Sequence, residues 1–305
     1  MDSAATEISH EFSPFFRVHK DGTIERSRQP EFAPPSDDPQ LPVRSKDILI
    51  NPQTGLSARL YLPTTLLQIS PTTQKKLPLL IYVHGGGFCL GSASSPKFHQ
   101  FVTSLAAAAN IAAVSVDYRL APEHPLPIAY DDAWEVFNWV LSHGSGSGPD
   151  LWLNDHVDFS SVFLGGESAG ANIVNNVAIR AGSSGVKILG LVLVHPFFGG
   201  KEVDKMYKFM CPSSSGFDND PRLNPLVDPG LPGMGCERVL FCIAEKDWLR
   251  ERGWGYYEAL GKSGWVGDRE IMESEGEGHG FHLFDPDCEK ARVLVERVAS
   301  FLNRV

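Results

Sequence analysis

The sequence feature that most constrains the fold is the pentapeptide GESAG at residues 166–170. It follows an apolar run at residues 162–165 and precedes a helical stretch at residues 171–181, so we expect a strand, a sharp turn and a helix in that order. The turn leaves no room for side chains two residues before or after Ser168, which explains Gly166 and Gly170. Ser168 would then stand at a helix N-terminus, where negative charge is favoured, as a nucleophile requires. The alternative is a glycine-rich turn with an incidental serine.

A second glycine-rich motif, HGGGF at residues 84–88, directly follows an early apolar run. Consecutive glycines let backbone amides approach an oxyanion that a side chain would block. We therefore expect the amides of Gly86 and Gly87, with that of Ala169, to stabilise the oxyanion of an acyl-transfer intermediate. The alternatives are a flexible glycine turn and a phosphate-binding loop, but the latter requires a following Lys and Ser or Thr, which this motif lacks.

A serine of ordinary pKa needs a base, and that base needs an acid to orient it. Where a strand–GxSxG–helix unit carries the nucleophile, the acid and then the histidine follow it in the chain. Asp247 follows a predicted strand at residues 238–244, and His279 lies in a loop after a predicted strand at residues 270–273. Because the carboxyl ends of parallel strands converge, we predict Ser168, Asp247 and His279 as the catalytic residues. The alternatives are Glu245, Asp228 or Asp220 as the acid and His282 or His195 as the base.

The wider pattern is that of an α/β fold. Apolar runs predict eight strands, at residues 46–50, 58–62, 79–84, 111–116, 162–165, 188–194, 238–244 and 270–273. Several runs are almost wholly apolar, as in strands that are covered on both faces. Amphipathic stretches at residues 131–142, 171–181 and 291–302 predict helices between and after them. The order of these elements predicts a mostly parallel sheet with helices on both faces.

Two regions are expected to lie outside the sheet. The first 44 residues contain a short extended pair followed by a proline-rich arm, and residues 199–232 are rich in Pro, Gly, Ser and Asp without a clear strand. We predict one domain over residues 1–305, in which the arm (1–44) and the insertion (199–232) together cap a site. Residues 66–76 and 142–150 have the composition of surface loops.

Composition excludes several other classes of function. The net charge of −10 over 305 residues argues against nucleic acid as a partner, because such binding depends on clustered Lys and Arg. The chain has no apolar run long enough to cross a membrane and no apolar leader at its start. Five scattered cysteines without a CxxC pair predict reduced thiols and a cytoplasmic protein. Neither a metal-binding HExxH nor a dinucleotide-binding GxGxxG after a strand is present, so neither a metal nor another cofactor is predicted.

Taken together, the motifs resemble those of plant carboxylesterases, in the hormone-sensitive-lipase-like branch of the α/β-hydrolases. The resemblance rests on HGGGF, on VDYRLAPEHP at residues 116–125, on GESAGAN at residues 166–172 and on EGEGHGFHLF at residues 275–284. Similar N-terminal (13–26) and C-terminal (262–282) stretches extend it over nearly the whole chain. Family members run further between residues 198 and 211, where this chain has only residues 199–210, and this departure bears on the shape of the substrate entrance and not on the catalytic residues. The resemblance implies an eight-stranded α/β-hydrolase sheet with a cap, and a serine hydrolase that needs no cofactor.

Relatives with other functions remain as alternatives. The resemblance also extends to gibberellin receptors, which lack the catalytic histidine, whereas this chain has His279. It extends to 2-hydroxyisoflavanone dehydratases, which carry threonine at the nucleophile position, whereas this chain has Ser168. Hydrolysis of small carboxylic esters is therefore the predicted function, with a lyase or cyclase of plant metabolism or a non-catalytic receptor as alternatives. Four aromatic residues next to the motifs are predicted to line the substrate pocket: Phe88, Phe198, Trp248 and Phe281.

Overall fold

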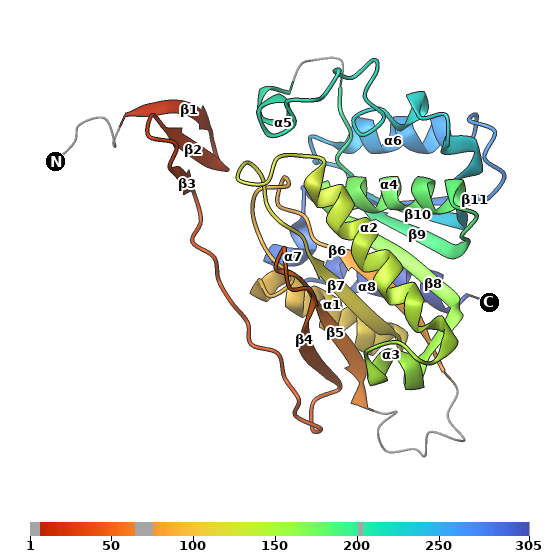
Figure 1. The fold of residues 1–305 in the computed structure, drawn as a ribbon. Helices are drawn as coiled ribbons and strands as arrows, with labels where there is room; N and C mark the ends of the chain where they lie inside the picture. The colour runs from red at the N-terminus through yellow and green to blue at the C-terminus, as the bar shows by residue number, and fades with distance from the viewer. Residues whose placement is uncertain (1–6, 65–75, 201–203, 305) are drawn as a thin grey trace.

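The computed structural model describes residues 7–64, 76–200 and 204–304. Its centre is an eight-stranded sheet with the order β11-β10-β9-β8-β6-β7-β5-β4 (Figure 1). Strands β4 and β5 form an antiparallel hairpin, β5 pairs antiparallel with β7, and the remaining pairs are parallel. The strands are β4 (Val43–Asn51), β5 (Leu56–Pro63), β6 (Leu77–Val83), β7 (Ala112–Asp117), β8 (Val157–Glu167), β9 (Ile188–Val194), β10 (Cys236–Ala244) and β11 (Asp268–Ser274).

All eight predicted strands are confirmed, and β9 has the predicted bounds. The largest difference is at β8, which begins five residues before its predicted start at residue 162. Residues 157–161 (VDFSS) mix polar and apolar side chains and lack an apolar run, but Val157 still pairs with Leu77 of β6. The backbone ladder, which does not depend on side-chain polarity, extends the strand there.

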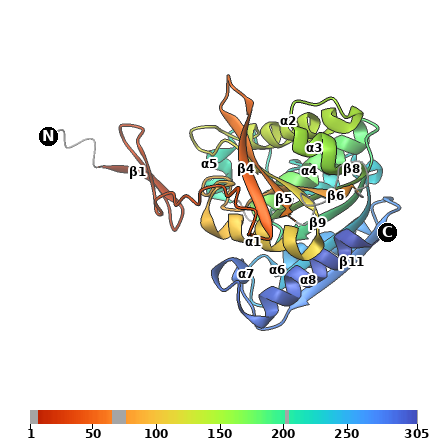
Figure 2. The same cartoon turned by 90° about the horizontal axis from the view of Figure 1, so that it is seen from below.

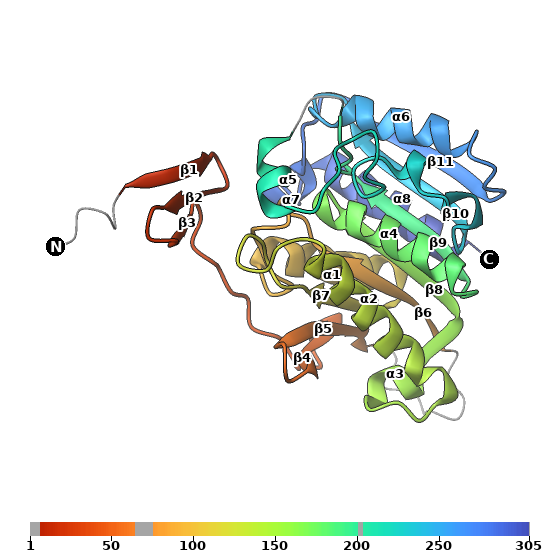
Figure 3. The same cartoon turned by 45° about the horizontal axis from the view of Figure 1, so that its top comes forward.

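Helices cover both faces of the sheet, which gives the predicted three-layer arrangement (Figures 2 and 3). One face packs against α2 (Ile128–Leu141), α4 (Ala169–Ser183) and α6 (Arg250–Leu260). The other packs against α1 (Pro96–Ala109), α7 (Phe281–Phe284) and α8 (Glu289–Asn303). Strand β6 shows why both faces are apolar: Leu79 and Ile81 face the first layer, whereas Leu80 and Tyr82 face the second. Successive side chains of a strand point to opposite faces, so a strand covered twice must be apolar throughout.

The N-terminal arm forms a small antiparallel sheet, β1 (Ile8–Phe12), β2 (Phe16–His19) and β3 (Ile24–Arg26), at one end of the molecule (Figure 1). The predicted extended pair is thus three strands. Arg26 fastens this sheet to the body, because its guanidinium donates to the Cys89 carbonyl at 2.8 Å and to the Glu123 carboxylate at 2.6 Å. Beyond it the chain runs extended to β4.

The predicted insertion is described at residues 199–200 and 204–232. The second of these stretches contains helical turns and loops but no strand, as expected. The helical turns are α5 (Lys205–Met210), η4 (Pro225–Val227) and η5 (Leu231–Gly233). Helix α5 lies beside the N-terminal sheet (Figure 3) and is in ring contact with it: the Phe209 ring is 5.0 Å from that of Phe12. The two segments predicted to form a cap are therefore neighbours.

The remaining predictions concern loops and thiols. The expected loop at residues 66–76 falls, except for Lys76, outside the described residues, and residues 142–150 contain a short 3₁₀ turn, η3 (Ser142–Ser145), before α3 (Leu151–His156). All five cysteines are free thiols, as predicted. Among the described residues, no helix is long and apolar enough to cross a membrane.

Candidate active site

Ser168 lies in the turn between β8 and α4, with φ 54° and ψ −117°. This is a rare conformation for a residue with a side chain, and it turns the chain sharply from strand to helix. The neighbouring glycines are required by contact: a Cβ at Gly170 would lie 2.0 Å from the Val83 carbonyl oxygen, and one at Gly166 would lie 2.5 Å from the Gly170 carbonyl carbon. The GESAG motif is therefore a close-packed turn that presents Ser168 at the start of α4.

The structure brings Ser168, His279 and Asp247 together from three separate loops. The Ser168 hydroxyl is 3.0 Å from His279 Nε2, and His279 Nδ1 is 2.8 Å from Asp247 Oδ2. The other Asp247 oxygen accepts the amide of Leu249 at 2.8 Å, which fixes the carboxylate. The loops follow β8, β10 and β11, three parallel strands that end at one edge of the sheet.

The electrostatics of this group agree with the geometry. Burial by itself would raise the pKa of Asp247, but the hydrogen bond to His279, the charge of His279 and the Leu249 amide together hold that pKa below its ordinary value. Burial by itself would lower the pKa of His279, but the hydrogen bond and charge of Asp247 outweigh it and raise that pKa. Asp247 therefore favours the protonated imidazole, as the partner of a general base should.

The alternative acids and bases have other partners. Glu245 accepts the Gly276 amide at 2.6 Å, Asp228 accepts the Gly230 amide, and Asp220 pairs with Arg222. His195 and His282 are buried, and burial holds both of their pKa values below the ordinary histidine value. Hydrogen-bond geometry thus separates Asp247 and His279 from these alternatives.

The HGGGF loop lies beside Ser168 in the cavity wall. Gly86 and Gly87 have φ values of 106° and 61°, which glycine adopts readily. A Cβ at Gly86 would lie 2.0 Å from the Leu90 carbonyl oxygen. Within the described part of the chain, the amides of Gly86, Gly87 and Ala169 donate to no other protein group. These amides are thus free to meet a developing negative charge.

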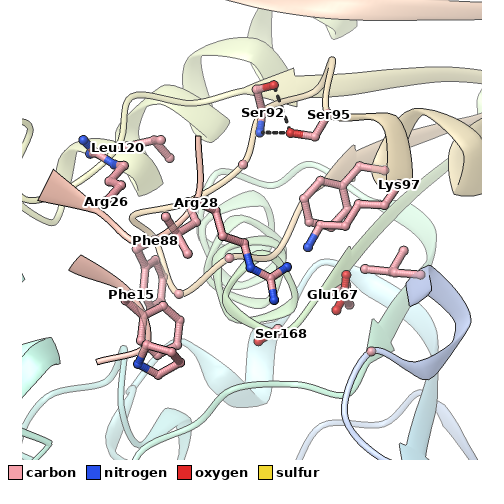
Figure 4. Close-up of a pocket in the computed structure, with 18 of the residues that line it drawn as sticks. Phe15, Arg26, Arg28, Phe88, Ser92, Ser95, Lys97, Leu120, Glu167 and Ser168 are labelled. Carbon is pink, nitrogen blue, oxygen red and sulfur yellow. Dashed lines mark hydrogen bonds between the residues drawn. The ribbon is translucent and has the colours of Figure 1, made fainter. Parts of the chain in front are cut away.

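The site opens into a cavity of about 1630 Å³ (Figure 4). Its wall includes Ser168, His279, Gly86 and Gly87, together with residues of the N-terminal arm and of α5. Phe15 from the arm reaches this wall: a Cβ added at Gly87 would lie only 2.9 Å from its ring.

Of the four predicted pocket residues, Phe88 and Trp248 line the cavity, but the predictions for Phe198 and Phe281 are wrong. The Phe198 ring packs against Tyr256, with 4.6 Å between ring centroids, and Phe281 packs beside His195 on the other face of the sheet. Both lie next to the motifs in sequence, but their side chains point into the core.

Sequence reasoning missed several lining residues: Phe15, Arg28, Lys97, Phe197, Tyr207 and Phe284. For Phe197 a signal existed, since it stands beside Phe198 in the HPFF stretch that directly follows β9. Neither Arg28 nor Lys97 carried such a signal. Arg28 lies in the N-terminal arm, and only the folding of this arm brings it to the cavity.

One group of side chains could by arrangement hold a metal ion: ligand atoms of His195, Asp247 and His279 lie within 4.8 Å of one another. Two of these residues already hydrogen-bond each other, and His195 Nδ1 accepts the Gly280 amide at 3.2 Å. Only His195 Nε2 in this group has no hydrogen-bond partner among the described residues, and the expectation of no metal stays a prediction.

Comparison with known proteins agrees with the fold. The sequence pattern of a family described as an alpha/beta hydrolase fold matches residues 80–283. Probable carboxylesterase 13 of Arabidopsis thaliana is 43% identical over 329 aligned positions, which cover 99% of each chain. The 2-hydroxyisoflavanone dehydratase of Glycyrrhiza echinata is 41% identical over 325 positions, with 98% of each chain covered.

Solved structures give the same result. An esterase from the archaeon Pyrobaculum calidifontis superposes with a TM-score of 0.68 at 28% identity, covering 85% of both chains. A thermostable carboxylesterase cloned from a metagenomic library gives 0.70 at 26% identity, covering 86% of this chain and 90% of the other. The chain described here belongs to the alpha/beta-hydrolase family, in the group that contains the plant carboxylesterases.

Proposed function

We propose that the protein is a serine carboxylesterase that hydrolyses small carboxylic esters through an acyl-enzyme. The observation that carries this proposal is the continuous hydrogen-bond chain from the Ser168 hydroxyl through His279 to Asp247, at the wall of a cavity large enough for a small ester. Relatives named carboxylesterase and solved esterase structures support the same activity.

In the proposed mechanism His279 removes the proton from Ser168 as the hydroxyl oxygen attacks the ester carbonyl. Asp247 holds the imidazole with Nδ1 protonated and stabilises its positive charge. The amides of Gly86, Gly87 and Ala169 bind the oxyanion of the tetrahedral intermediate. His279 then protonates the departing alcohol, and a water molecule, activated by the same histidine, releases the acid from Ser168.

A dehydratase-like lyase is the second candidate, because one relative is named 2-hydroxyisoflavanone dehydratase. The hydrogen bond between Ser168 and His279 favours hydrolysis, since it activates an oxygen nucleophile that elimination does not need. A receptor that binds without turnover would have no use for that contact. Product analysis separates these possibilities, since hydrolysis gives an acid and an alcohol, whereas dehydration gives an unsaturated product and water.

The same proposal covers the cap and the location. Residues of both 1–44 and 199–232 line the cavity, which supports their role as a cap over the ester. We propose a cytoplasmic location; two relatives of 42% identity are named as chloroplastic and one of 41% as amyloplastic, so a plastid is the alternative. A fluorescent fusion of the full chain in plant cells tests this placement.

The test of the activity is hydrolysis of 4-nitrophenyl butyrate by the wild type and by Ser168→Ala. We expect the substitution to lower kcat by about 10⁴-fold or more, because without the nucleophile only binding and oxyanion stabilisation remain. Ser183→Ala, at the far end of the same helix, is the matched control and should keep wild-type activity. Equal rates for the wild type and Ser168→Ala would overturn the proposal.

A further inference from the structure

The cavity beside Ser168 contains cationic side chains that the proposed mechanism does not use. Four of them line its wall: Arg26, Arg28, Lys97 and Arg119. Two are neutralised by carboxylates, since Arg26 pairs with Glu123 and Arg119 pairs with Asp132, each at 2.6 Å. Neither Arg28 nor Lys97 forms an ion pair or a hydrogen bond with another described residue.

Arg28 and Lys97 are nevertheless close to one another. Both lie against the same aromatic ring, that of Phe284: the Arg28 guanidinium carbon is 5.8 Å from the ring centroid, and Lys97 Nζ is 5.3 Å from it. In Figure 4 the Arg28 guanidinium reaches into the cavity above Ser168, and the Lys97 amine points toward Glu167. Two positive charges therefore share one side of the cavity near the nucleophile.

This arrangement disfavours the positive charge of Lys97 as it stands. Burial is the largest influence on Lys97 and lowers its pKa; the charge of Glu167 raises that pKa, and the positive charge of Arg28, a smaller effect, lowers it. Five carboxyl groups line the cavity wall, and two of them, Glu31 and Glu167, act on Lys97 through their charge. Glu31 is exposed and pairs with neither cation. Glu167 is buried, one of its oxygens has no hydrogen-bond partner, and burial raises its pKa, which weakens it as a counter-ion.

We propose that Arg28 and Lys97 form a subsite for a carboxylate carried by the ester substrate, so that the preferred substrates are acidic esters. A carboxylate has two oxygens and can meet both cations at once, with hydrogen bonds stronger than those between neutral groups. Ser95 and Pro96, at the N-terminal end of α1, line the same wall, where the positive end of the helix also favours an anion.

The net charge of the chain is negative, so anions are attracted to this subsite and not to the protein surface in general. At −10 the protein as a whole repels anions, so two neighbouring cations that form no ion pair are not part of a general positive surface. Arg28 comes from the N-terminal arm and Lys97 from α1, so the subsite exists only when the arm is folded over the body. The inference rests on the proposed ester hydrolysis for its reaction, but its residues are separate from those of the catalytic group.

The test compares matched acidic and neutral esters. One pair carries the charge on the alcohol side, 4-acetoxybenzoate against 4-acetoxybenzamide, and the other carries it on the acyl side, mono-4-nitrophenyl adipate against 4-nitrophenyl hexanoate. In at least one pair we expect the acidic ester to have a kcat/KM about tenfold or more above that of the neutral one. Lys97→Met and Arg28→Gln should each remove most of this preference and change kcat/KM for the neutral ester by less than about threefold.

Lys262→Met is the control, since this exposed lysine follows α6 and lies outside the cavity wall. It should leave the preference unchanged. The absence of a preference in both pairs, or a preference that survives both subsite substitutions, would overturn the inference.

If no ester is turned over in a Ser168-dependent way, the proposed function fails, but the subsite can still be tested. The measurement is then the calorimetric binding of 4-acetoxybenzoate and 4-acetoxybenzamide to Ser168→Ala. Equal affinities there would refute it.

Discussion

Replacement of Gly86 by alanine tests whether the HGGGF loop supplies the oxyanion donors. The new Cβ would lie 2.0 Å from the Leu90 carbonyl oxygen, where real contacts are essentially never shorter than 3.0 Å. The loop must therefore move by about 1 Å, since the obstacle is backbone and not the end of a flexible side chain. The φ of 106° adds strain of about 1–2 kcal/mol for any residue with a side chain.

A displacement of that size is large compared with the tolerance of an oxyanion hole. Donors must lie about 2.7–3.1 Å from the developing charge, and loss of one donor lowers kcat by about 10²–10³-fold. We therefore expect Gly86→Ala to lower kcat for 4-nitrophenyl butyrate by about 10²-fold or more. The change in KM should be smaller, because the oxyanion exists only in the transition state and the intermediate.

Gly55→Ala provides the matched control for backbone strain. Gly55 also has a positive φ, 78°, but lies in the turn between β4 and β5, where an added Cβ meets nothing within 4 Å. This variant should lose about 1–2 kcal/mol in the free energy of unfolding and keep its kcat. Urea unfolding and steady-state kinetics on both variants separate the two effects. A Gly86→Ala variant with kcat within threefold of the wild type would refute the assignment of the loop.

Two further predictions follow from the site. The pKa of His279 is raised and the base must be neutral, so kcat/KM should fall as the pH drops through a value above the ordinary histidine pKa of 6.5. Asp247→Asn should shift this acidic limb of the pH profile to lower pH and reduce kcat by about 10³–10⁴-fold. An acidic limb that does not move would count against the pairing of Asp247 with His279. Asn172 is buried, accepts a hydrogen bond from Tyr130 and donates to the backbone carbonyls of Phe197 and Arg222. Asn172→Ala should therefore lower the free energy of unfolding in urea by about 2–4 kcal/mol, and an unchanged midpoint would contradict this.

The sequence determined the elements of the fold because their signals are local. Apolar runs predicted every strand of the central sheet, and their bounds differ mainly where backbone pairing extends a strand past its apolar part, as in β8. The glycines around Ser168 and in the HGGGF loop are set by contacts with nearby backbone, so they too could be recognised in the sequence. Chain order then placed Asp247 and His279 among the few candidates for the remaining roles, and the structure brings both within hydrogen-bond distance of one another.

Only the tertiary structure decided which side chains face the cavity. Phe88 and Trp248 line it, whereas Phe198 and Phe281 turn into the core, although all four stand next to a motif. The unpaired cations are the clearer case, since Arg28 and Lys97 come from different segments and meet only against the Phe284 ring. The direction of a side chain and the partners that it lacks depend on what packs around it from distant parts of the chain, and no local pattern of residues records that packing.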